Sequence, residues 1–408
     1  MMTKDELTDL FRIGVRAADP VRAVQASLGS APLPAHARLF VLGLGKAACA
    51  MTRAALAVLP TPAAALVVTN YENAADVAGA EVMAAGHPVP DENGLRAAQA
   101  AEAMLAQAGP DDRVLVLVSG GGSALLPAPA YGLSLSDKAE VSRILLAGGM
   151  DIVAMNAVRQ HLSRLKGGGL LRAAHPAPVT ALILSDVIGD DLRAIASGPT
   201  VAPIAPRAHV VEMLRASGMW ARLPDTVQTV LMRAETETDL PAMSAGNRLI
   251  GSNRQSLEAM AQARSEARII STALVGDVTD AAEVILRAMR DAPGPLALFG
   301  GETTVTLTGT GLGGRNQDLA LRVALALDGQ EGWRFLSAGT DGRDGPTDAA
   351  GAIVDGQTCA RIRAAGGDPE ALLANNDSNS ALALAGDLLV TGGTGTNGAD
   401  LQILALAR

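Results

Sequence analysis

Short apolar runs alternate with amphipathic stretches through the first half of the chain, which is the pattern of strands separated by helices. Buried strands are predicted at 39–43, 64–69, 114–118 and 179–184, and helices at 91–107 and 137–146 among others. Strands that alternate with helices usually form a parallel sheet with both faces covered. The first half is therefore expected to contain such a sheet.

The N-terminus carries two helix-start signals. Thr3 and Glu6 have the spacing of a capping box, which predicts a helix that runs to about Ala17. Asp19 followed by Pro20 is typical of a cap and a first helical position, so a second, short helix is expected there.

The second half repeats the alternation after a polar stretch. Residues 206–233 favour a helix, and the acidic stretch 235–241 marks the expected domain boundary. Residues 303–308 alternate Thr with Val and Leu, which predicts a half-exposed, antiparallel strand. Further strands are predicted at 269–275, 296–299, 334–337 and 401–404, with a helix that begins at Asp280.

The expected fold class is therefore α/β, with two α/β/α-type domains. Residues 1–235 would form a Rossmann-like domain with a mostly parallel sheet, and residues 236–408 a domain with a mixed sheet. Clefts between two such domains are common places for substrates to bind, so an interdomain cleft is expected to hold the site.

Charge and composition exclude several classes of function. The 408 residues carry 33 Lys and Arg against 42 Asp and Glu, a formal charge of −9, so general affinity for nucleic acid is not expected. Only 2% of the chain is aromatic, which disfavours stacking on bases. Glycines and prolines interrupt the uncharged stretch 114–136, which predicts no membrane span. Without a secretory signal, a cytoplasmic protein is expected.

The turn at 43–48 follows a predicted strand and has the pattern G-x-G-x-x-A. Gly43 and Gly45 would let backbone N–H groups approach a phosphate. An NAD site also needs an acidic residue near the end of the next strand, where Asn70 stands instead. Lys46 suits phosphate oxygens better than a nicotinamide dinucleotide. The alternative is a tight turn with a solvated lysine.

Two further segments follow predicted strands at the edge where open α/β sheets bind ligands. Residues 119–123 can form a nest of N–H groups for an anion, or only a sharp turn; they are Ser119, Gly120, Gly121, Gly122 and Ser123. Asp186 follows the strand 179–184, where its carboxylate could hold Mg²⁺, accept a proton from a substrate hydroxyl, or cap a turn.

Glycine turns in the second half carry further charged residues. Arg315 lies at the start of a predicted helix, where its guanidinium could clamp a carboxylate or a phosphoryl group, or form a surface ion pair. Glu302 and Asn316 lie in the same glycine-flanked segments. Asp341 and Asp348 belong to an Asp-rich loop that suits Mg²⁺ or a hydroxyl, or an ordinary surface turn.

Other chemistries find no support in the sequence. The five histidines lack metal-binding spacing, Cys49 and Cys359 fit no zinc pattern, and the motif G-x-S-x-G of a nucleophile elbow is absent from the glycine loop. Glycine loops, isolated cations and Asp residues remain. That inventory fits phosphoryl transfer, in which a protein positions groups and neutralises charge.

Taken together, these segments resemble the class II glycerate 2-kinase family, whose C-terminal half is known as the multi-organism fragment with rich leucine. The resemblance covers nearly the whole chain. In order, it rests on GLGKAA at 43–48, GHPVPDENG at 86–94, SGGGS at 119–123, KGGG at 166–169, SDVIGDD at 185–191, GGRNQ at 313–317, TDGRDGPTD at 340–348 and TGTNGAD at 394–400.

The resemblance implies ATP- and Mg²⁺-dependent phosphorylation of D-glycerate at its 2-hydroxyl, giving 2-phosphoglycerate. Lys46 and Arg315 match the family's essential cations. Asp186 is expected as metal ligand or base, with Asp341 as its competitor in both roles. The loop 120–123 would bind phosphate, and the remaining expected binding residues are Lys166, Glu302, Asn316 and Asp348. D-glycerate and ATP are then the partners, and a homodimer is left open.

Two other classes stay open. Members of this family have also been named hydroxypyruvate reductases, and the turn at 43–48 would then hold NAD(P)H. A two-domain solute-binding protein would share the cleft architecture and need no catalysis, although such proteins usually carry a secretory signal.

Overall fold

The computed structural model describes residues 1–233, 245–291 and 294–407. These residues form two compact units. The N-terminal unit is Pro20–Ile250, and the C-terminal unit is Met1–Asp19 together with Gly251–Arg408. The predicted boundary between residues 235 and 236 lies outside the described residues. The first helix belongs by its contacts to the C-terminal unit, although the sequence-based division 1–235 groups it with the first domain.

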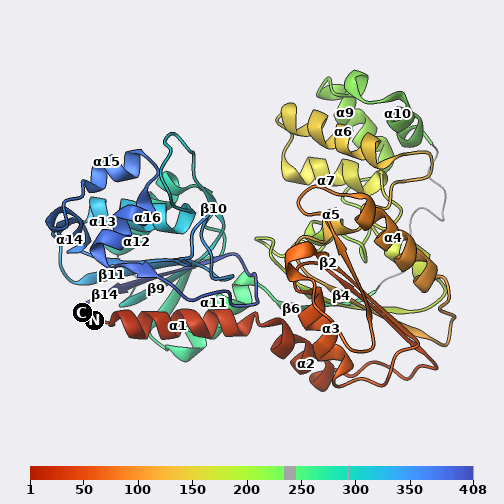
Figure 1. Ribbon diagram of the computed structural model, residues 1–408, viewed down its shortest axis with the longest axis horizontal. Helices are drawn as coiled ribbons and strands as arrows, with labels where there is room; N and C mark the ends of the chain where they lie inside the picture. The colour runs from red at the N-terminus through yellow and green to blue at the C-terminus, as the bar shows by residue number, and fades with distance from the viewer. Residues whose placement is uncertain (234–244, 292–293, 408) are drawn as a thin grey trace. The chain divides into compact units, whose positions relative to one another are not determined.

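The N-terminal unit contains a six-stranded sheet in the order β3-β2-β1-β4-β5-β6 (Figure 1). The pairs among β1 to β5 are all parallel, with Leu42 of β1 opposite Leu66 of β2 and Val116 of β4. The strands are β1 (Leu39–Leu44), β2 (Ala64–Asn70), β3 (Glu81–Ala85), β4 (Arg113–Val118), β5 (Val179–Leu184) and β6 (Gly246–Gly251). The predicted parallel sheet is confirmed.

Both faces of this sheet are buried because neighbouring side chains along each strand point to opposite sides. Phe40 and Leu42 pack into one core, and Leu39 and Val41 into the other. The first core lies under α4 (Glu92–Leu105), α5 (Gly122–Leu125) and α8 (Gly169–Ala174). The second lies under α2 (Pro20–Ser30) and α3 (Ala48–Leu56).

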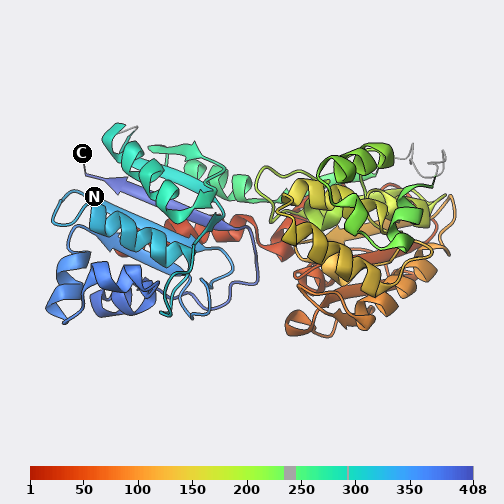
Figure 2. The same cartoon turned by 90° about the horizontal axis from the view of Figure 1, so that it is seen from above.

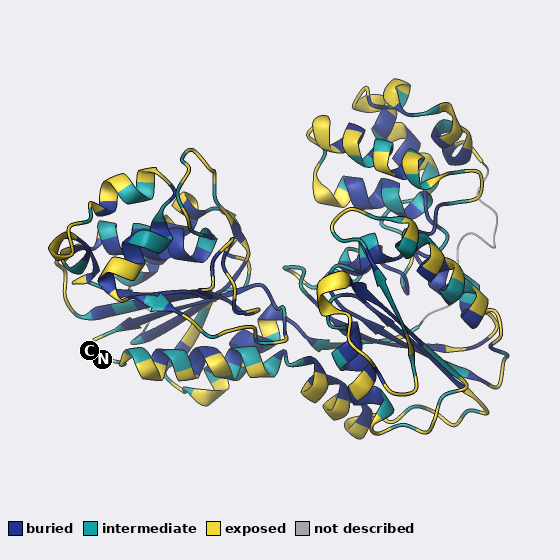
Figure 3. Cartoon of the chain, viewed as in Figure 1, coloured by how far each residue is buried: buried dark blue, intermediate teal, exposed yellow. Residues whose placement is uncertain are grey.

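A group of helices forms a separate small core in the same unit. They are α6 (Leu135–Ala147), α7 (Ile152–His161), α9 (Arg207–Ala216) and α10 (Asp225–Leu231). Figure 3 shows their buried faces turned toward one another and their exposed faces outward. The predicted helical stretch 206–233 is broken in two, because Gly218 adopts a φ of +69° and Pro224 precedes the second helix.

The C-terminal unit contains a second six-stranded sheet, in the order β13-β12-β11-β14-β9-β7. Figure 2 shows the last strand of this sheet leading to the C-terminus. Its pairs are antiparallel except for β7 with β9, so the predicted mixed sheet is confirmed. The strands are β7 (Ala267–Ser271), β9 (Leu296–Gly301), β11 (Trp333–Gly339), β12 (Gly351–Asp355), β13 (Leu388–Leu389) and β14 (Asp400–Leu406).

Helices cover both faces of the second sheet. One core contains residues of α12 (Val278–Asp291) and α13 (Arg315–Ala326), and the other contains residues of α1 (Lys4–Ala17) and α11 (Asn253–Ala263). Leu7, Leu10 and Phe11 fall on one face of α1 and are buried there. The capping box of Thr3 and Glu6 is present as predicted. The remaining helices are α14 (Thr358–Ala364), α15 (Pro369–Ala374) and α16 (Ser378–Ala385).

The prediction of an antiparallel strand at 303–308 is wrong. Only Thr303–Thr304 form a strand, β10, and it pairs parallel, not antiparallel, with β8 (Gly276–Asp277). Beyond β10, Thr306 donates a hydrogen bond to Asp277 and the Thr308 amide donates one to Asn376. Side-chain hydrogen bonds replace the strand ladder there. Among the described residues, no helix is long and apolar enough to cross a membrane.

The packing of α1 predicts a stability effect confined to the C-terminal unit. Phe11 is fully buried, so Phe11→Ala should cost about 3–5 kcal/mol of unfolding free energy. The chain has two tryptophans, Trp220 in the N-terminal unit and Trp333 in the C-terminal unit. In a Trp220→Phe background, Phe11→Ala should therefore lower the urea midpoint reported by Trp333 fluorescence.

Arg12→Ala is the matched control, because the Arg12 side chain on the same helix is 56% exposed. It should leave the midpoint nearly unchanged. The placement of α1 would be contradicted if Phe11→Ala shifted the transition seen by Trp220, in a Trp333→Phe background, and left the Trp333 transition in place.

Candidate functional site

Two glycine turns of the N-terminal unit lie side by side at the carboxyl ends of β1 and β4. These strands are parallel neighbours, so the turns that follow them meet at one edge of the sheet. The Ser119 amide donates to the Leu44 carbonyl at 2.8 Å. The Lys46 amide donates in return to the Gly120 carbonyl at 2.9 Å.

The first turn, at 43–48, uses its own amide groups inside the fold. Gly45 donates to Val68 O at 3.1 Å, and Ala47 donates to the Ser119 hydroxyl at 3.0 Å. The Ala48 amide bonds to Gly45 O at 3.2 Å. A Cβ on Gly45 would lie 2.3 Å from Ser119 Oγ, so this glycine is needed for close packing. The turn therefore offers few amides to a phosphate.

This result changes the interpretation of three predicted binding residues. A Cβ on Gly43 would lie 2.4 Å from the Thr52 hydroxyl oxygen, so Gly43 serves the approach of α3 to β1. Gly45 and Ser119 hold the two turns together, as described above. Ser119 is also buried, with 1% of its surface exposed. Gly43, Gly45 and Ser119 therefore serve the packing of the two turns and of α3 at the edge of the sheet.

The second turn, at 120–123, keeps its amide groups unengaged. Within the described ranges, the backbone N–H groups of Gly120, Gly121, Gly122 and Ser123 donate to no acceptor outside helix α5. Gly121 has a φ of +84°, which a residue with a side chain rarely adopts. Successive amides in such a turn form a concave site for an anion. The structure therefore supports the second turn over the first as the anion-binding loop.

Lys46, Asp186 and His87 surround this loop. A Cβ on Gly120 would lie 1.8 Å from Asp186 Oδ2, so the carboxylate lies directly against the loop. A Cβ on Gly121 would lie 3.2 Å from Lys46 Cγ and 3.3 Å from His87 Nε2. The Lys46 ammonium makes no hydrogen bond or ion pair with another described residue. It is therefore available to a ligand.

The electrostatics of these groups follow from burial and from Lys46. Burial raises the pKa of the Asp186 carboxyl, while Lys46 opposes that shift. Burial lowers the pKa of His87, and the positive charge of Lys46 adds to the effect. His87 is therefore neutral at pH 7, and its ring can accept as well as donate a hydrogen bond.

Lys166 also contacts the glycine loop 120–123. Its ammonium donates to the Ser123 carbonyl at 2.6 Å and to Ser123 Oγ at 2.9 Å. The Ser123 and Ser197 hydroxyls lie 2.7 Å apart, and Ser197 Oγ donates to Asn156 at 3.3 Å. Lys166 therefore lies beside the loop, where its ammonium orients Ser123.

A cavity of about 570 Å³ opens beside the loop. Gly121, Ser123 and Lys166 line it, together with Lys138 of α6 and Arg159 of α7. Burial lowers the pKa of Lys166 to about 7, and Arg159 adds to the shift. Burial also holds the pKa of Lys138 well below its ordinary value. The cavity thus gathers three cations that the fold does not neutralise well.

In the C-terminal unit, two carboxylates fix Arg315. Its Nε donates to Asp400 Oδ2 at 2.6 Å and its Nη2 to Asp400 Oδ1 at 2.9 Å, a two-point contact. Its Nη1 lies 3.1 Å from Glu302 Oε1. The Arg315 side chain is still 34% exposed, so the guanidinium is both held and accessible. This contact places Glu302 directly beside Arg315.

Asp344, not Asn316, organises the start of α13. Its carboxylate accepts hydrogen bonds from the amides of Asn316 at 3.0 Å and Gln317 at 2.8 Å. The Asn316 side chain is buried, donates to Asp344 at 3.3 Å and accepts from Ser337 at 2.7 Å. Both polar atoms of its side chain therefore already have hydrogen-bond partners within the protein. Asn316 therefore anchors the start of α13, next to Arg315, with a buried side chain.

The remaining predicted carboxylates of this unit are exposed. A Cβ on Gly339 would lie 3.3 Å from Asp341 Oδ1 and 3.5 Å from Asp400 Oδ1, so Asp341 lies near the Arg315 cluster. Its Oδ1 accepts from the Arg343 amide at 2.9 Å. Asp348 is exposed in the same loop. The described residues contain no group of three or more His, Cys, Asp or Glu that could hold a metal ion.

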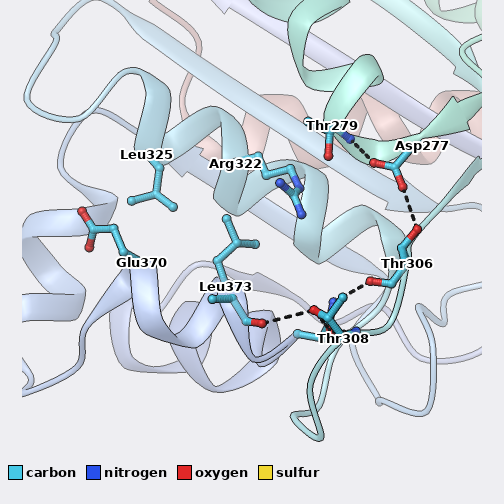
Figure 4. Close-up of a pocket in the computed structure, with 10 residues that line it drawn as sticks. Asp277, Thr279, Thr306, Thr308, Arg322, Leu325, Glu370 and Leu373 are labelled. Carbon is cyan, nitrogen blue, oxygen red and sulfur yellow. Dashed lines mark hydrogen bonds between the residues drawn. The ribbon is translucent and has the colours of Figure 1, made fainter.

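A separate cavity of the C-terminal unit, of about 470 Å³, is lined by Asp277, Thr306, Arg322 and Glu370 among others (Figure 4). Its polar groups bond to one another. Asp277 accepts hydrogen bonds from the Thr279 amide at 2.8 Å and the Thr306 hydroxyl at 3.2 Å. None of the residues predicted for the site lines this cavity, so it contributes nothing to the candidate site.

Sequence reasoning missed four residues that the structure brings to the two clusters: His87, Lys138, Arg159 and Asp400. His87 and Asp400 stand inside motifs that supported the family resemblance, which is a signal that could have marked them. Lys138 and Arg159 lie on amphipathic helices and carry no local signal.

The buried lysines predict a dependence of stability on pH. Lys166 has a folded pKa of about 7, below its ordinary value, so the unfolded chain binds more protons between pH 7 and 9. The free energy of unfolding should therefore rise with pH in that window. The slope for one proton is at most about 1.4 kcal/mol per pH unit.

Urea unfolding of wild type and Lys166→Met at pH 7, 8 and 9 measures this slope, and the variant should show a smaller one. The pKa of His87 is lowered from its ordinary value, so its imidazole contributes little to the slope above pH 7. Equal slopes in the two proteins would contradict a strained, buried Lys166.

Comparison with known proteins gives matches over most of the chain. Residues 6–232 match the family described as a domain of unknown function, DUF4147, and residues 295–400 match the MOFRL family. The D-glycerate 2-kinase of Thermotoga maritima is 40% identical over 409 residues, covering 97% of this chain and 96% of that protein.

Two further matches complete the comparison. A protein of Agrobacterium vitis whose name proposes hydroxypyruvate reductase activity is 40% identical over 415 residues, covering 98% of this chain and 94% of that one. The crystal structure of a glycerate kinase from Thermotoga maritima matches with a TM-score of 0.90 at 39% identity and covers 98% of both chains. The motifs, the two sheets and these relatives together show that the chain belongs to the glycerate 2-kinase family of enzymes.

Proposed function

We propose that this enzyme transfers the γ-phosphoryl group of ATP to the 2-hydroxyl of D-glycerate, giving 2-phosphoglycerate and ADP. The observation that carries the proposal is the loop 120–123, whose unengaged amides lie beside Lys46 and Asp186. Phosphoryl transfer depends on donors and cations fixed around phosphate oxygens. The relative from Thermotoga maritima named D-glycerate 2-kinase supports the choice of acceptor and position.

In this proposal, Lys46 neutralises charge that develops on the transferred phosphoryl group. Its backbone is anchored to Gly120 O at 2.9 Å, while its ammonium is unpaired among the described residues. The amides of Gly121 and Gly122 donate to phosphate oxygens of the nucleotide. Donors that are fixed before the reaction need no reorganisation when charge develops.

Asp186 is the carboxylate that we propose for holding Mg²⁺. It lies against the phosphate loop, and no other described side chain donates a hydrogen bond to it. Mg²⁺ is commonly held by one or two carboxylates together with substrate phosphates, so a single carboxylate here fits the ion. When bound, Mg²⁺ supplies charge neutralisation between phosphate oxygens.

Arg315 is proposed to hold the carboxylate of D-glycerate. A guanidinium has five N–H groups in a planar fork, and Asp400 engages one edge of it. Glu302 approaches Nη1 at 3.1 Å but is about half exposed, so a substrate carboxylate could replace it. Asp341, whose carboxylate is exposed, is proposed as the acceptor of the proton from the 2-hydroxyl. Asp348 remains a further candidate for contact with the acceptor.

The alternative of an NAD(P)H-dependent hydroxypyruvate reductase is supported only by the names of some relatives. Such an enzyme would bind the pyrophosphate of the dinucleotide on the amides of the turn at 43–48. Those amides are bonded to Val68 O, Gly120 O and Ser119 Oγ. The phosphotransferase is therefore the better proposal.

The test is incubation with D-glycerate, ATP and Mg²⁺, followed by phosphorus NMR, in parallel with hydroxypyruvate and NADH or NADPH. We expect 2-phosphoglycerate and no nicotinamide oxidation. Lys46→Ala and Arg315→Ala should each lower kcat/KM by about 10²-fold or more, since each removes one fixed charge from the transition state.

Arg12→Ala serves as the control, because Arg12 is exposed and belongs to neither cluster. It should leave kcat/KM within about twofold of wild type. Nicotinamide oxidation without a phosphorylated product would overturn the kinase proposal. A folded Lys46→Ala or Arg315→Ala protein with nearly full activity would remove that residue from the mechanism.

A further inference from the structure

The cavity beside the glycine loop brings three cationic side chains together. Lys138 comes from α6, Arg159 from α7, and Lys166 from the segment that follows α7. Lys138 and Lys166 are 8% and 6% exposed, and both donate only to neutral groups. Arg159 makes no hydrogen bond or ion pair with another residue in the described part of the chain.

No carboxylate balances these charges. The described residues that line the cavity include no Asp or Glu. The charged groups that act on Lys138 are Lys166, Arg159 and Arg164, all of them positive. Arg143 also lines the cavity but is paired with Glu140, and Arg164 nearby is paired with Glu102. These three basic side chains therefore have no anionic partner among the described residues that line the cavity.

Such an arrangement is costly for a protein that binds nothing there. Buried charges are normally paired, and like charges that share a low-dielectric site repel one another. A bound anion would remove both costs at once. The cavity is contiguous with the loop 120–123, since Gly121 and Ser123 line it, so an anion here would also meet the unengaged amides.

Part of the lining of the cavity is an apolar wall. It is formed by the aliphatic residues Ala124, Leu135, Ala139, Val141, Leu146 and Leu162. D-glycerate is small and polar on every side, so it has nothing to bury against that wall. A ligand that fits the whole cavity carries several negative charges at one end and a flat or apolar group at the other. A nucleoside polyphosphate has both.

We propose that this cavity is the nucleotide subsite, in which Lys138, Arg159 and Lys166 hold phosphate oxygens and the aliphatic wall holds the base. The inference rests on the proposed function and assigns its donor substrate to a place in the N-terminal unit. Two residues outside every recognised motif, Lys138 and Arg159, then determine nucleotide affinity.

The test is direct binding without D-glycerate, by equilibrium dialysis of the full chain with ADP, tripolyphosphate or adenosine as separate probes. Arg159→Gln should raise the Kd for ADP and for tripolyphosphate at least about tenfold, because it removes one charge-assisted contact. It should change the Kd for adenosine by less than about threefold, because adenosine carries no phosphate. Arg222→Gln, at an exposed arginine outside the cavity, is the control and should leave all three unchanged.

A second variant separates binding from folding. Lys138→Met removes a buried basic group whose desolvation and positive neighbours are unfavourable, so the protein without ligand should have a higher Tm than wild type. The same variant should bind ADP at least about tenfold more weakly. A structural lysine would give the opposite first result, a lower Tm. The Tm and the Kd for ADP together show whether Lys138 binds the ligand or stabilises the fold.

Two outcomes overturn the inference. ADP binding that is unchanged in both Arg159→Gln and Lys138→Met would show that the nucleotide binds elsewhere. Weaker binding of D-glycerate with unchanged binding of ADP would make the cavity the acceptor subsite. Failure of the kinase proposal is distinguishable, because it appears as an absence of phosphorylated product with wild-type protein, whereas these binding constants are measured without turnover.

Discussion

The structure of the N-terminal unit depends on the contact between the turns that follow β1 and β4. Four hydrogen bonds join them. Ser119 donates to the Leu44 carbonyl through both its amide and its hydroxyl, the Lys46 amide donates to Gly120, and the Ala47 amide donates to the Ser119 hydroxyl. This contact satisfies the amides of the first turn and leaves those of the second unengaged. It also fixes the backbone of Lys46 beside the second turn. One packing constraint thus decides which glycine turn can bind an anion and which cation stands next to it.

The two units differ in whether their cationic side chains are paired with carboxylates. Arg315 of the C-terminal unit is held by Asp400 and Glu302, which keeps its charge fixed and its desolvation compensated. In the N-terminal unit, Lys46 has no ion-pair partner among the described residues, and Lys138, Arg159 and Lys166 lie around one cavity. The first arrangement favours a defined geometry, and the second favours affinity for a polyanion at some cost in stability. A kinase requires both, because it must orient a small acceptor and neutralise a highly charged donor.

Much of the fold was predictable because its signals are local. The apolar runs at 39–43 and 179–184 became β1 and β5, and the capping box of Thr3 and Glu6 begins α1. Features set by distant partners were not predictable. The segment 303–308 looked antiparallel, but only two of its residues form a strand, and they pair parallel with β8. The packing of α1 on the second sheet likewise depends on residues beyond 250.

The same distinction holds for the candidate site. Lys46, the loop 120–123 and Asp186 follow strands that pair in parallel, so their convergence could be inferred from the order of elements. The engagement of the first turn's amides could not, because the acceptors Val68, Gly120 and Ser119 are far along the chain. Lys138 and Arg159 were also missed, since the packing of α6 beside α7, and not a motif, makes them neighbours.

The most direct test of the account is a crystal structure of the protein soaked with ADP and Mg²⁺. The account predicts that the β-phosphate accepts hydrogen bonds from the amides of Gly121 and Gly122, with Lys46 and Asp186 alongside. A phosphate bound instead on the turn at 43–48, or one that contacts neither turn, would contradict it.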